Sequence, residues 1–376
     1  MNFKQTYLKG KQGKSTGLPT GIKALTEVMR GIPRRAIIGV AAAPKVGKTT
    51  LSDFAFLLSP YLLCPDADIH WIYFSFEVER IKKEFKFAAY FFWHDFKIDT
   101  FKHKGKTYDI SADYFMGKLV DPDSGEQIFV SEEHENMLRK IYLERIIPLF
   151  GEYDENGIQI KKGKIDFIEQ KENPTGLRNY LISYAKRNGR FIEQDYKVLD
   201  AKGEEVKKKR VVGYKPNNPD SYLIVFTDHM RKVPPERGFS KKETIDKWLE
   251  YQVELRNWCG YTFVDIIHIN RSMSDTDRLK YMKDCIYPNG DDIKDTGNLS
   301  EDCDYLITMF NPNDDKYNLT KHFGMQLVDD KTKKVLHPRY RSIHLVDSRD
   351  TECPKHIRVD MNGANNNFTP IKEPTK

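Results

Sequence analysis

One unit near the start of the chain restricts the fold more than any other feature. Residues 35–41 (R-A-I-I-G-V-A) form an apolar run with the length of a buried strand, and residues 42–50 read A-A-P-K-V-G-K-T-T. In residues 49–59, Leu51, Phe54 and Leu58 are spaced for one buried face of a helix. A buried strand, a loop ending in G-K-T and a helix form the setting in which backbone N–H groups surround a phosphate. The unit therefore predicts a phosphate-binding loop, or P-loop.

The loop supplies the groups that a nucleotide site requires. Gly47 lets the backbone approach the phosphates, Lys48 can reach the β- and γ-phosphates, and the Thr49 hydroxyl can bind Mg²⁺. Ala42 stands where the pattern G-x-x-x-x-G-K-[ST] has its first glycine, and alanine is compatible with a strand end of negative φ. A chance G-K-T on the surface is the alternative, which the flanking strand and helix disfavour. The expected nucleotide-binding residues are Ala43, Pro44, Lys45, Val46, Gly47, Lys48, Thr49 and Thr50.

Further apolar runs alternate with helical patterns along the chain. A helix rich in Lys, Phe and Ala is expected after residue 76, and an amphipathic helix at residues 242–259. Strands that alternate with helices predict an α/β fold with a mainly parallel central sheet flanked by helices. Ligands bind such sheets at the carboxyl ends of the strands. The expected strands are residues 69–76, 222–227, 261–269, 304–310, 342–346 and 356–361.

The alternation breaks between about residues 95 and 220. Turn sequences at 121–126 and 155–157 separate short alternating runs, and a hairpin is expected from residues 191–199 and 206–214, whose second arm contains K-K-K-R. A similar hairpin is expected around residues 329–332. We interpret these segments as β-hairpin insertions that decorate a core. The expected division is a flexible basic arm (1–15), one domain (16–367) that carries the inserted region, and a tail (368–376).

Composition narrows the classes of protein further. Hydrophobic residues make up 39% of the 376-residue chain, which is enough for a packed core. The five cysteines are widely spaced and odd in number, so neither a disulfide framework nor a zinc site is expected. No apolar run has the length of a membrane span, and the basic start lacks the apolar segment of a secretory signal. These features favour a cytoplasmic protein without a membrane partner. The net charge of +6 permits an anionic partner without requiring one.

Three polar residues follow predicted strands and are candidates for chemistry. Glu77 could polarise an attacking water near the γ-phosphate, or it could simply begin a helix. Asp228 could support the Mg²⁺ ion of a nucleotide, or it could end a strand or cap a helix. His268 could contact the γ-phosphate, although an isolated histidine at a strand end is more often structural.

Taken in order, these motifs resemble the RecA-like ATPase domain of DnaB-like replicative helicases. Residues 16–31 resemble the T-G-x-x-T-G entry of that family, and the P-loop resembles its A-R-P-x-x-G-K-T, which often lacks the first glycine. F-S-F-E, at residues 74–77, is similar to F-S-L-E, and residues 224–228 look like the Walker B strand. Residues 266–272 are similar to the strand that ends in Q-L-N-R-S, and residues 292–304 resemble a D-L-R-E-S-G…D-A-D stretch. The similarity spans about residues 16–367.

The resemblance implies a role for each candidate. Glu77 would be the hydrolytic base, Lys48 and Thr49 would bind phosphate and Mg²⁺, and Asp228 would support the metal. His268 stands where the family has glutamine and would sense the γ-phosphate. Near the end of the chain, residues 347–349 read D-S-R where the family has K-x-R. Arg349 is therefore the expected arginine finger, which would act on a neighbouring subunit. Asp347 replaces the lysine of the family. The implied cofactors are ATP and Mg²⁺.

The resemblance also implies partners. A homo-oligomeric ring, a hexamer in that family, would surround single-stranded DNA, and other replication proteins could bind it. Basic stretches after Asp228 and at residues 271–297 would face the central channel, where Lys and Arg follow a phosphate backbone, although each could also be a solvated loop. Only about 15 residues precede Thr16, too few for the N-terminal domain and linker helix of the family.

Three functions remain open on these grounds. The first is a ring-forming ATPase that moves on single-stranded DNA as a helicase during replication. The second is a RecA-like accessory protein, such as a recombination protein or a helicase loader, that hydrolyses ATP without unwinding. The third is a nucleotide-gated, DNA-binding scaffold that hydrolyses little ATP. The size and the hairpins suggest a virus such as a phage as the source, in which case the cytoplasm would be that of the host.

Overall fold

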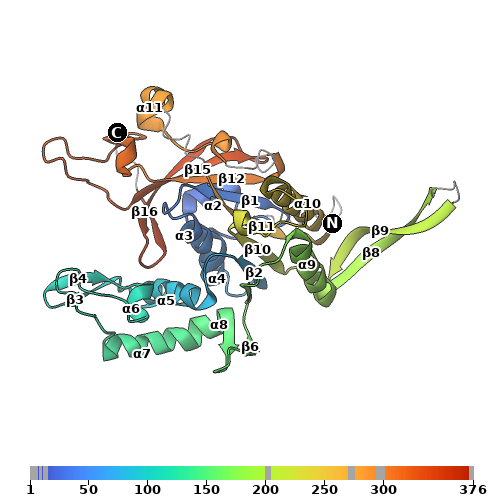
Figure 1. Ribbon diagram of the computed structural model, residues 1–376, viewed down its shortest axis with the longest axis horizontal. Helices are drawn as coiled ribbons and strands as arrows, with labels where there is room; N and C mark the ends of the chain where they lie inside the picture. The colour runs from blue at the N-terminus through green and yellow to red at the C-terminus, as the bar shows by residue number, and fades with distance from the viewer. Residues whose placement is uncertain are drawn as a thin grey trace.

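A nine-stranded sheet forms the centre of the protein (Figure 1). The structure, a computed structural model, describes residues 16–199, 205–269, 276–293 and 301–371, together with Tyr7 and Lys11. The sheet has the strand order β17-β16-β15-β12-β1-β11-β10-β2-β7. The strands are β1 (Ile37–Ala42), β2 (Ile69–Ser75), β7 (Ile165–Ile168), β10 (Tyr222–Asp228), β11 (Thr262–His268), β12 (Tyr305–Phe310), β15 (Tyr340–Ser348), β16 (Lys355–Asn362) and β17 (Asn367–Pro370).

Six neighbouring strands of this sheet, from β12 to β7, run parallel, and β15, β16 and β17 extend it with antiparallel strands. Every residue of β1 is buried, which explains its uninterrupted apolar sequence, because helices cover both faces of a parallel sheet. The predicted α/β class with a mainly parallel sheet is therefore confirmed. The predicted runs of residues 35–41, 69–76, 222–227, 261–269 and 304–310 coincide with β1, β2, β10, β11 and β12 to within a few residues.

Each face of the sheet packs against its own set of helices. On one face, Ile38 and Val40 join a core with the helices that follow the P-loop, α3 (Lys48–Asp53), η1 (Phe54–Leu58) and α4 (Ser59–Leu63), and with α5 (Arg80–Phe96). On the other face, Ile37 and Ala41 pack against α9 (Pro174–Asn188) and α10 (Lys241–Cys259). The alternation of these β1 side chains between two cores is the period of a strand.

The region between residues 95 and 220 is only partly a decoration. It contains two small hairpins, a helical segment and the long hairpin, but β7 joins the central sheet beside β2, and α9 covers one of its faces. The expectation that the whole region decorates the core was wrong for these two elements and for the helical segment. The other elements of the region are β3 (Thr100–His103), β4 (Lys106–Asp109), α6 (Ala112–Phe115), α7 (Glu132–Ile141), η2 (Tyr142–Ile146), α8 (Ile147–Phe150), β5 (Gly151–Tyr153), β6 (Gln159–Lys162), β8 (Gly189–Leu199) and β9 (Glu205–Pro216). Of these, α6, α7, η2 and α8 bury side chains in the same core as α5.

Short elements complete the described chain. They are α2 (Lys23–Met29), η3 (Met230–Lys232), α11 (Thr276–Met282), η5 (Lys283–Cys285), η6 (Gly290–Asp292), η7 (Asp315–Tyr317), β13 (Lys321–His322) and β14 (Met325–Gln326). Strand β17 carries the sheet beyond the expected boundary at residue 367, while the division into arm, domain and tail stays a prediction. Most of the predicted basic arm, residues 271–275 and 294–297 of the predicted channel stretch, and residues 372–376 of the predicted tail lie outside the described residues. In the part that is described, no helix is both long and apolar enough to cross a membrane.

Candidate nucleotide site

The loop of residues 43–47 leaves the carboxyl end of β1 in the middle of the sheet, between β11 and β12. Ala42 is the last residue of β1 and pairs with His268 of β11, so that it lies in the strand and needs no glycine. Gly47 has a φ of 116°, and a Cβ atom there would meet the sulfur of Met361 at 2.5 Å. This position requires glycine both for its backbone conformation and for its close neighbour.

Lys48 and Thr49 open helix α3 directly after this glycine. The Lys48 side chain is buried, and this burial lowers the pKa of its ammonium group, while the nearby carboxylates of Asp228 and Glu77 oppose the shift. The Thr49 hydroxyl lies 3.5 Å from Oδ1 of Asp228, at the end of β10. The structure therefore brings the predicted lysine, threonine and aspartate together, although β10 lies far from the P-loop in sequence.

A network of buried polar side chains contacts Asp228. Its Oδ2 atom lies 3.1 Å from the hydroxyl of Tyr73 in β2, and that hydroxyl also lies 3.0 Å from Oδ1 of Asp53 in α3. The ammonium of Lys83 in α5 donates to the Tyr73 hydroxyl over 2.8 Å and to Asp53. Lys83 is also 3.8 Å from Oδ2 of Asp228. One buried cation thus faces two buried carboxylates and a shared hydroxyl group.

Neither Tyr73 nor Lys83 was predicted from the sequence, although the position of Lys83 on its helix is informative. It occupies the same helical face as Phe87, four residues later, and Phe87 is fully buried. A lysine on the apolar face of a helix needs a buried partner. The partner, Asp53, could not be inferred in the same way because it lies on a different helix.

Glu77 lies just beyond the carboxyl end of β2, beside the carboxyl end of β10, where Asp228 is the last residue. The backbone N–H of Phe76 donates to the carbonyl of Asp228 over 2.7 Å, which ties the two strand ends together. The Glu77 side chain is about one-third exposed and lies 3.8 Å from the ammonium of Lys232. Its carboxylate is accessible and close enough to Lys48 to affect the pKa of that lysine, while its role as a base stays a prediction.

His268 ends β11, and its ring packs at a tilt against that of a second histidine, His229, which was not predicted from the sequence. Their ring centroids are 4.1 Å apart. Burial and the charge of Lys48 lower the pKa of His268 to about 4, and burial, together with His268 and Lys48, lowers that of His229 to about 2. Both rings are therefore neutral at physiological pH. Nδ1 of His268 and Nε2 of His229 are buried without a hydrogen-bond partner among the described residues.

Two arginines differ in their relation to the site. Arg349 follows the last residue of β15, which pairs with the first residue of β12. It therefore lies at the amino ends of the parallel strands, whereas the P-loop lies at their carboxyl ends. There its guanidinium lies 3.4 Å from Oδ1 of Asp304. Arg341, at the other end of β15, was not predicted; its Nε atom donates to the carbonyl of Val46 in the P-loop over 3.3 Å.

These residues fit a nucleotide. The glycine cradle at Gly47, the buried lysine and the two orphaned ring nitrogens are groups that phosphate oxygens could satisfy. Among the described residues no cluster of three or more His, Cys, Asp or Glu side chains could hold a metal by itself. Mg²⁺ is commonly bound by one or two protein groups together with phosphate and water, which is the set that Thr49 and Asp228 would provide. The metal stays a prediction.

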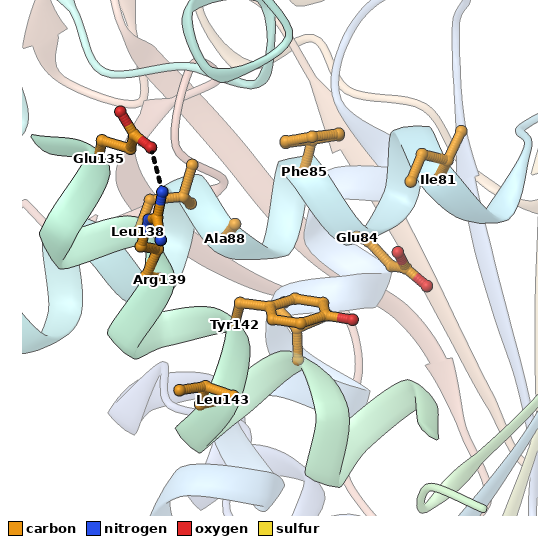
Figure 2. Close-up of a pocket in the computed structure, with 10 residues that line it drawn as sticks. Ile81, Glu84, Phe85, Ala88, Glu135, Leu138, Arg139, Tyr142 and Leu143 are labelled. Carbon is orange, nitrogen blue, oxygen red and sulfur yellow. Dashed lines mark hydrogen bonds and ion pairs between the residues drawn. The ribbon is translucent and has the colours of Figure 1, made fainter. Parts of the chain in front are cut away.

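A separate cavity of about 540 Å³ lies between α5 and the α7–η2 helical segment (Figure 2). Its lining is mainly apolar and includes Ile81, Phe85, Leu138 and Tyr142, and a Glu135–Arg139 ion pair of 2.7 Å borders it. None of the predicted site residues lines this cavity. It is therefore distinct from the nucleotide site.

The comparisons with known proteins show the fold. No protein-family model matches the chain, and no curated protein matches it. The structure is similar to that of a DnaB-like replicative helicase, described together with its interactions with primase, with a TM-score of 0.60 and 14% identity over 98% of this chain. It is also similar to a second solved structure, an ATPase domain, with a TM-score of 0.61 and 14% identity over 98% of this chain and 96% of that domain. The chain spans 65% of the length of the first of these proteins. The predicted RecA-like fold and the resemblance to DnaB-like ATPase domains are confirmed at the level of the fold.

Proposed function

We propose that this chain is a Mg²⁺-dependent ATP hydrolase of the DnaB-like type, which moves on single-stranded DNA during replication. One observation carries the proposal. Strands β1, β10 and β2 bring Lys48, Thr49, Asp228 and Glu77 to one edge of the sheet, and a nucleotide site needs these four groups together. The fold similarity to helicase ATPase domains supports the same conclusion. Such a protein would act in the cytoplasm, that of the host if its source is viral.

The geometry suggests how each residue acts. The P-loop amides and Lys48 would hold the phosphates, and Lys48 would balance the charge that develops on the γ-phosphate. A Mg²⁺ ion, held through Thr49 and Asp228, would supply further positive charge to the phosphates. Glu77 would orient a water molecule and accept its proton. The neutral rings of His268 and His229 would offer their free nitrogens to the phosphate side of the site.

The test compares ATP hydrolysis with and without single-stranded DNA. Lys48→Ala and Glu77→Gln should each lower turnover by about 100-fold or more, because each removes a group that acts on the reacting phosphate. Lys82→Ala and Glu79→Gln are matched controls, since these two residues form an exposed ion pair at the start of α5, shortly after Glu77. Unchanged turnover in the first two variants would refute the site assignment.

The proposed ring explains why Arg349 lies far from its own P-loop. In such a ring, Arg349 would complete the site of the neighbouring subunit. Arg349→Ala and Lys48→Ala should each be inactive alone, but a mixture should regain activity where an intact P-loop meets an intact Arg349. The absence of any recovery in mixed assemblies, or a monomeric mass with and without ATP, would contradict the ring.

A RecA-like ATPase that does not unwind DNA is the second candidate. Two features favour it, because both change the groups that are offered to a neighbouring subunit. Asp347 replaces the lysine of the family, and Arg349 lies within ion-pair distance of Asp304. A strand-displacement assay separates the two candidates. ATP-dependent unwinding by the purified protein would exclude this second candidate.

A further inference from the structure

The β8–β9 hairpin extends as a two-stranded ribbon away from the rest of the protein (Figure 1). Among its described residues, the base makes the contacts that anchor it to α9 and α10. There Phe191 packs on Trp258 of α10 with a centroid distance of 6.2 Å, and the Tyr214 hydroxyl donates to the carbonyl of Ala185 in α9 over 2.9 Å. Both anchoring residues form an opposed pair and therefore occupy the same face of the ribbon.

The strand register divides the remaining side chains between two faces. Directly opposed residues of an antiparallel pair share a face, and successive residues alternate. The face opposite to Phe191 and Tyr214, which we call the basic face, contains the opposed pairs Arg190–Lys215, Gln194–Arg210 and Tyr196–Lys208. Two further pairs on this face are uncharged: Ile192–Gly213, beside which the strand register shifts, and Val198–Val206. Among the described residues of the ribbon, this face has four cations and no carboxylate.

The other face, which we call the mixed face, has a balanced charge. Its cations are Lys197, Lys207 and Lys209, and its carboxylates are Glu193, Asp195 and Glu205. They form ion pairs across the strands: Lys197 with Glu205 at 2.6 Å and Lys209 with Glu193 at 3.6 Å. The three acidic residues of the described ribbon are thus all on the mixed face, and the net positive charge belongs to the basic face.

The contacts on the basic face leave its charge available. Arg210 lies 3.3 Å from the neutral Oε1 atom of Gln194 and 5.5 Å from the ring centroid of Tyr196. Lys208 and Lys215 are exposed. A row of cations that is not neutralised by carboxylates matches a chain of phosphates, and an arginine beside a tyrosine ring is a common platform for a nucleic-acid base.

From this asymmetry we propose that the basic face of the β8–β9 ribbon binds the phosphate backbone of DNA at a distance from the nucleotide site. The inference goes beyond the proposed function, which needs DNA only in the central channel, and shares with it only the choice of DNA as partner. The phosphates could belong to a single strand or to a duplex. Tyr196 distinguishes them, because stacking requires a base that is not paired inside a duplex.

The test measures DNA binding of the full-length protein by fluorescence anisotropy, on a labelled single strand and on a duplex of the same length, over a range of salt concentrations. The variant Lys208→Gln/Arg210→Gln removes two cations from the basic face. Lys207→Gln/Lys209→Gln is the matched control, since it removes the same charge from the same strand on the mixed face. Circular dichroism checks that both variants keep the fold.

The basic-face variant should bind the single strand roughly tenfold or more weakly near about 0.1 M salt, with the slope of log K against log salt reduced by about 1.4. The control should bind within about twofold of the wild type, because its lysines already have carboxylate partners or neighbours. If the ligand is a single strand, Tyr196→Ser should weaken binding to the single strand and not to the duplex. If the basic-face variant weakens binding to both DNAs equally and Tyr196→Ser has no effect, the ribbon contacts only the phosphate backbone.

Equal losses in the two double variants would overturn the inference, because binding would then follow net charge and not the face. Unchanged binding in both would also overturn it. The ATPase assay separates this outcome from a failure of the proposed function. Hydrolysis that persists in Lys48→Ala would refute the proposed ATPase site while leaving the DNA-binding result for the ribbon intact.

Discussion

The ammonium of Lys83 lies 2.8 Å from Oδ2 of Asp53, and each of these side chains is only 1% exposed. The pair joins α5, which follows Glu77, to α3, which begins at Lys48. Through the hydroxyl of Tyr73 it also contacts Asp228. The helices on one face of the sheet are therefore connected to Asp228, at the carboxyl end of β10, by a continuous set of buried polar contacts.

Removal of Lys83 alone should be strongly destabilising. Lys83→Met leaves the Asp53 carboxylate buried without its cation, which costs about 3–5 kcal/mol of unfolding free energy. Lys83→Met/Asp53→Asn should recover part of this loss, because the Asp53 charge is removed together with its cation, while Asp228 loses Lys83 but keeps Lys48 nearby. Urea denaturation measures both. Lys82→Met is the control, since Lys82 is half-exposed and its pairing with Glu79 should contribute less than about 1 kcal/mol. A double variant as unstable as the single one would contradict this explanation.

Tyr73→Phe should affect the metal more than the fold. The change removes the hydroxyl that lies 3.1 Å from Oδ2 of Asp228, so that the carboxylate loses a restraint worth about 1 kcal/mol. The Mg²⁺ concentration needed for half-maximal binding of a fluorescent ATP analogue should rise by about fivefold. Tyr180→Phe is a matched control, because it removes a similar Tyr–Asp hydrogen bond, to Asp166 of β7, on a different strand. An equal rise in both variants would exclude a specific effect on Asp228.

His268→Gln should change the response of the protein to acid. Burial lowers the pKa of His268 to about 4, so that the native ring stays neutral while the unfolded ring gains a proton near its ordinary value of 6.5. Stability from this residue is therefore present above about pH 6.5 and decreases as the pH falls toward about 4. The glutamine variant, which cannot titrate, should lose less stability than the wild type over this interval. Thermal unfolding across the interval measures the difference, and parallel curves for the two proteins would contradict it.

The sequence predicted the fold where local pattern determines structure. Every residue of β1 is buried, so the run of residues 35–41 identified it without other information. Strand β7 was missed because its four residues, Ile165–Ile168, follow a lysine-rich hairpin and give little periodicity. The antiparallel direction of β15 beside β12 could not be inferred either, because hydrophobic spacing does not record strand direction.

The candidate site was predictable only in part, for a similar reason. Lys48, Thr49 and Asp228 belong to motifs with a fixed place relative to a strand, so their meeting could be expected from the rule that ligands bind at carboxyl ends. Tyr73, Lys83 and His229 depend on contacts between elements that are distant in sequence. Ala42, by contrast, follows from the local pattern, because alanine was expected to fit a strand end and it is the last residue of β1.

The last prediction concerns Asp265, which is fully buried in β11 and accepts a hydrogen bond from Gln252 over 2.9 Å. Burial raises the pKa of its carboxyl from 3.8 to about 7, against the opposing effect of hydrogen bonds from Thr227 and Gln252. The native state therefore keeps a proton that the unfolded state has released. The stability that this group contributes is complete below about pH 4 and is lost as the pH rises to about 7.

Asp265→Asn, which carries no charge at any pH, should remove this loss. Relative to the wild type, the variant should gain up to about 4 kcal/mol of unfolding free energy between about pH 4 and pH 8. Asp329→Asn should change the pH dependence of the unfolding free energy in the opposite direction. Hydrogen bonds from Thr332 lower the pKa of the Asp329 carboxyl, so the stability that this carboxyl contributes is present at neutral pH and lost in acid. Denaturant unfolding at several pH values measures both variants. A constant difference between Asp265→Asn and the wild type across this range would show that Asp265 is ionised in the native state and would refute the argument.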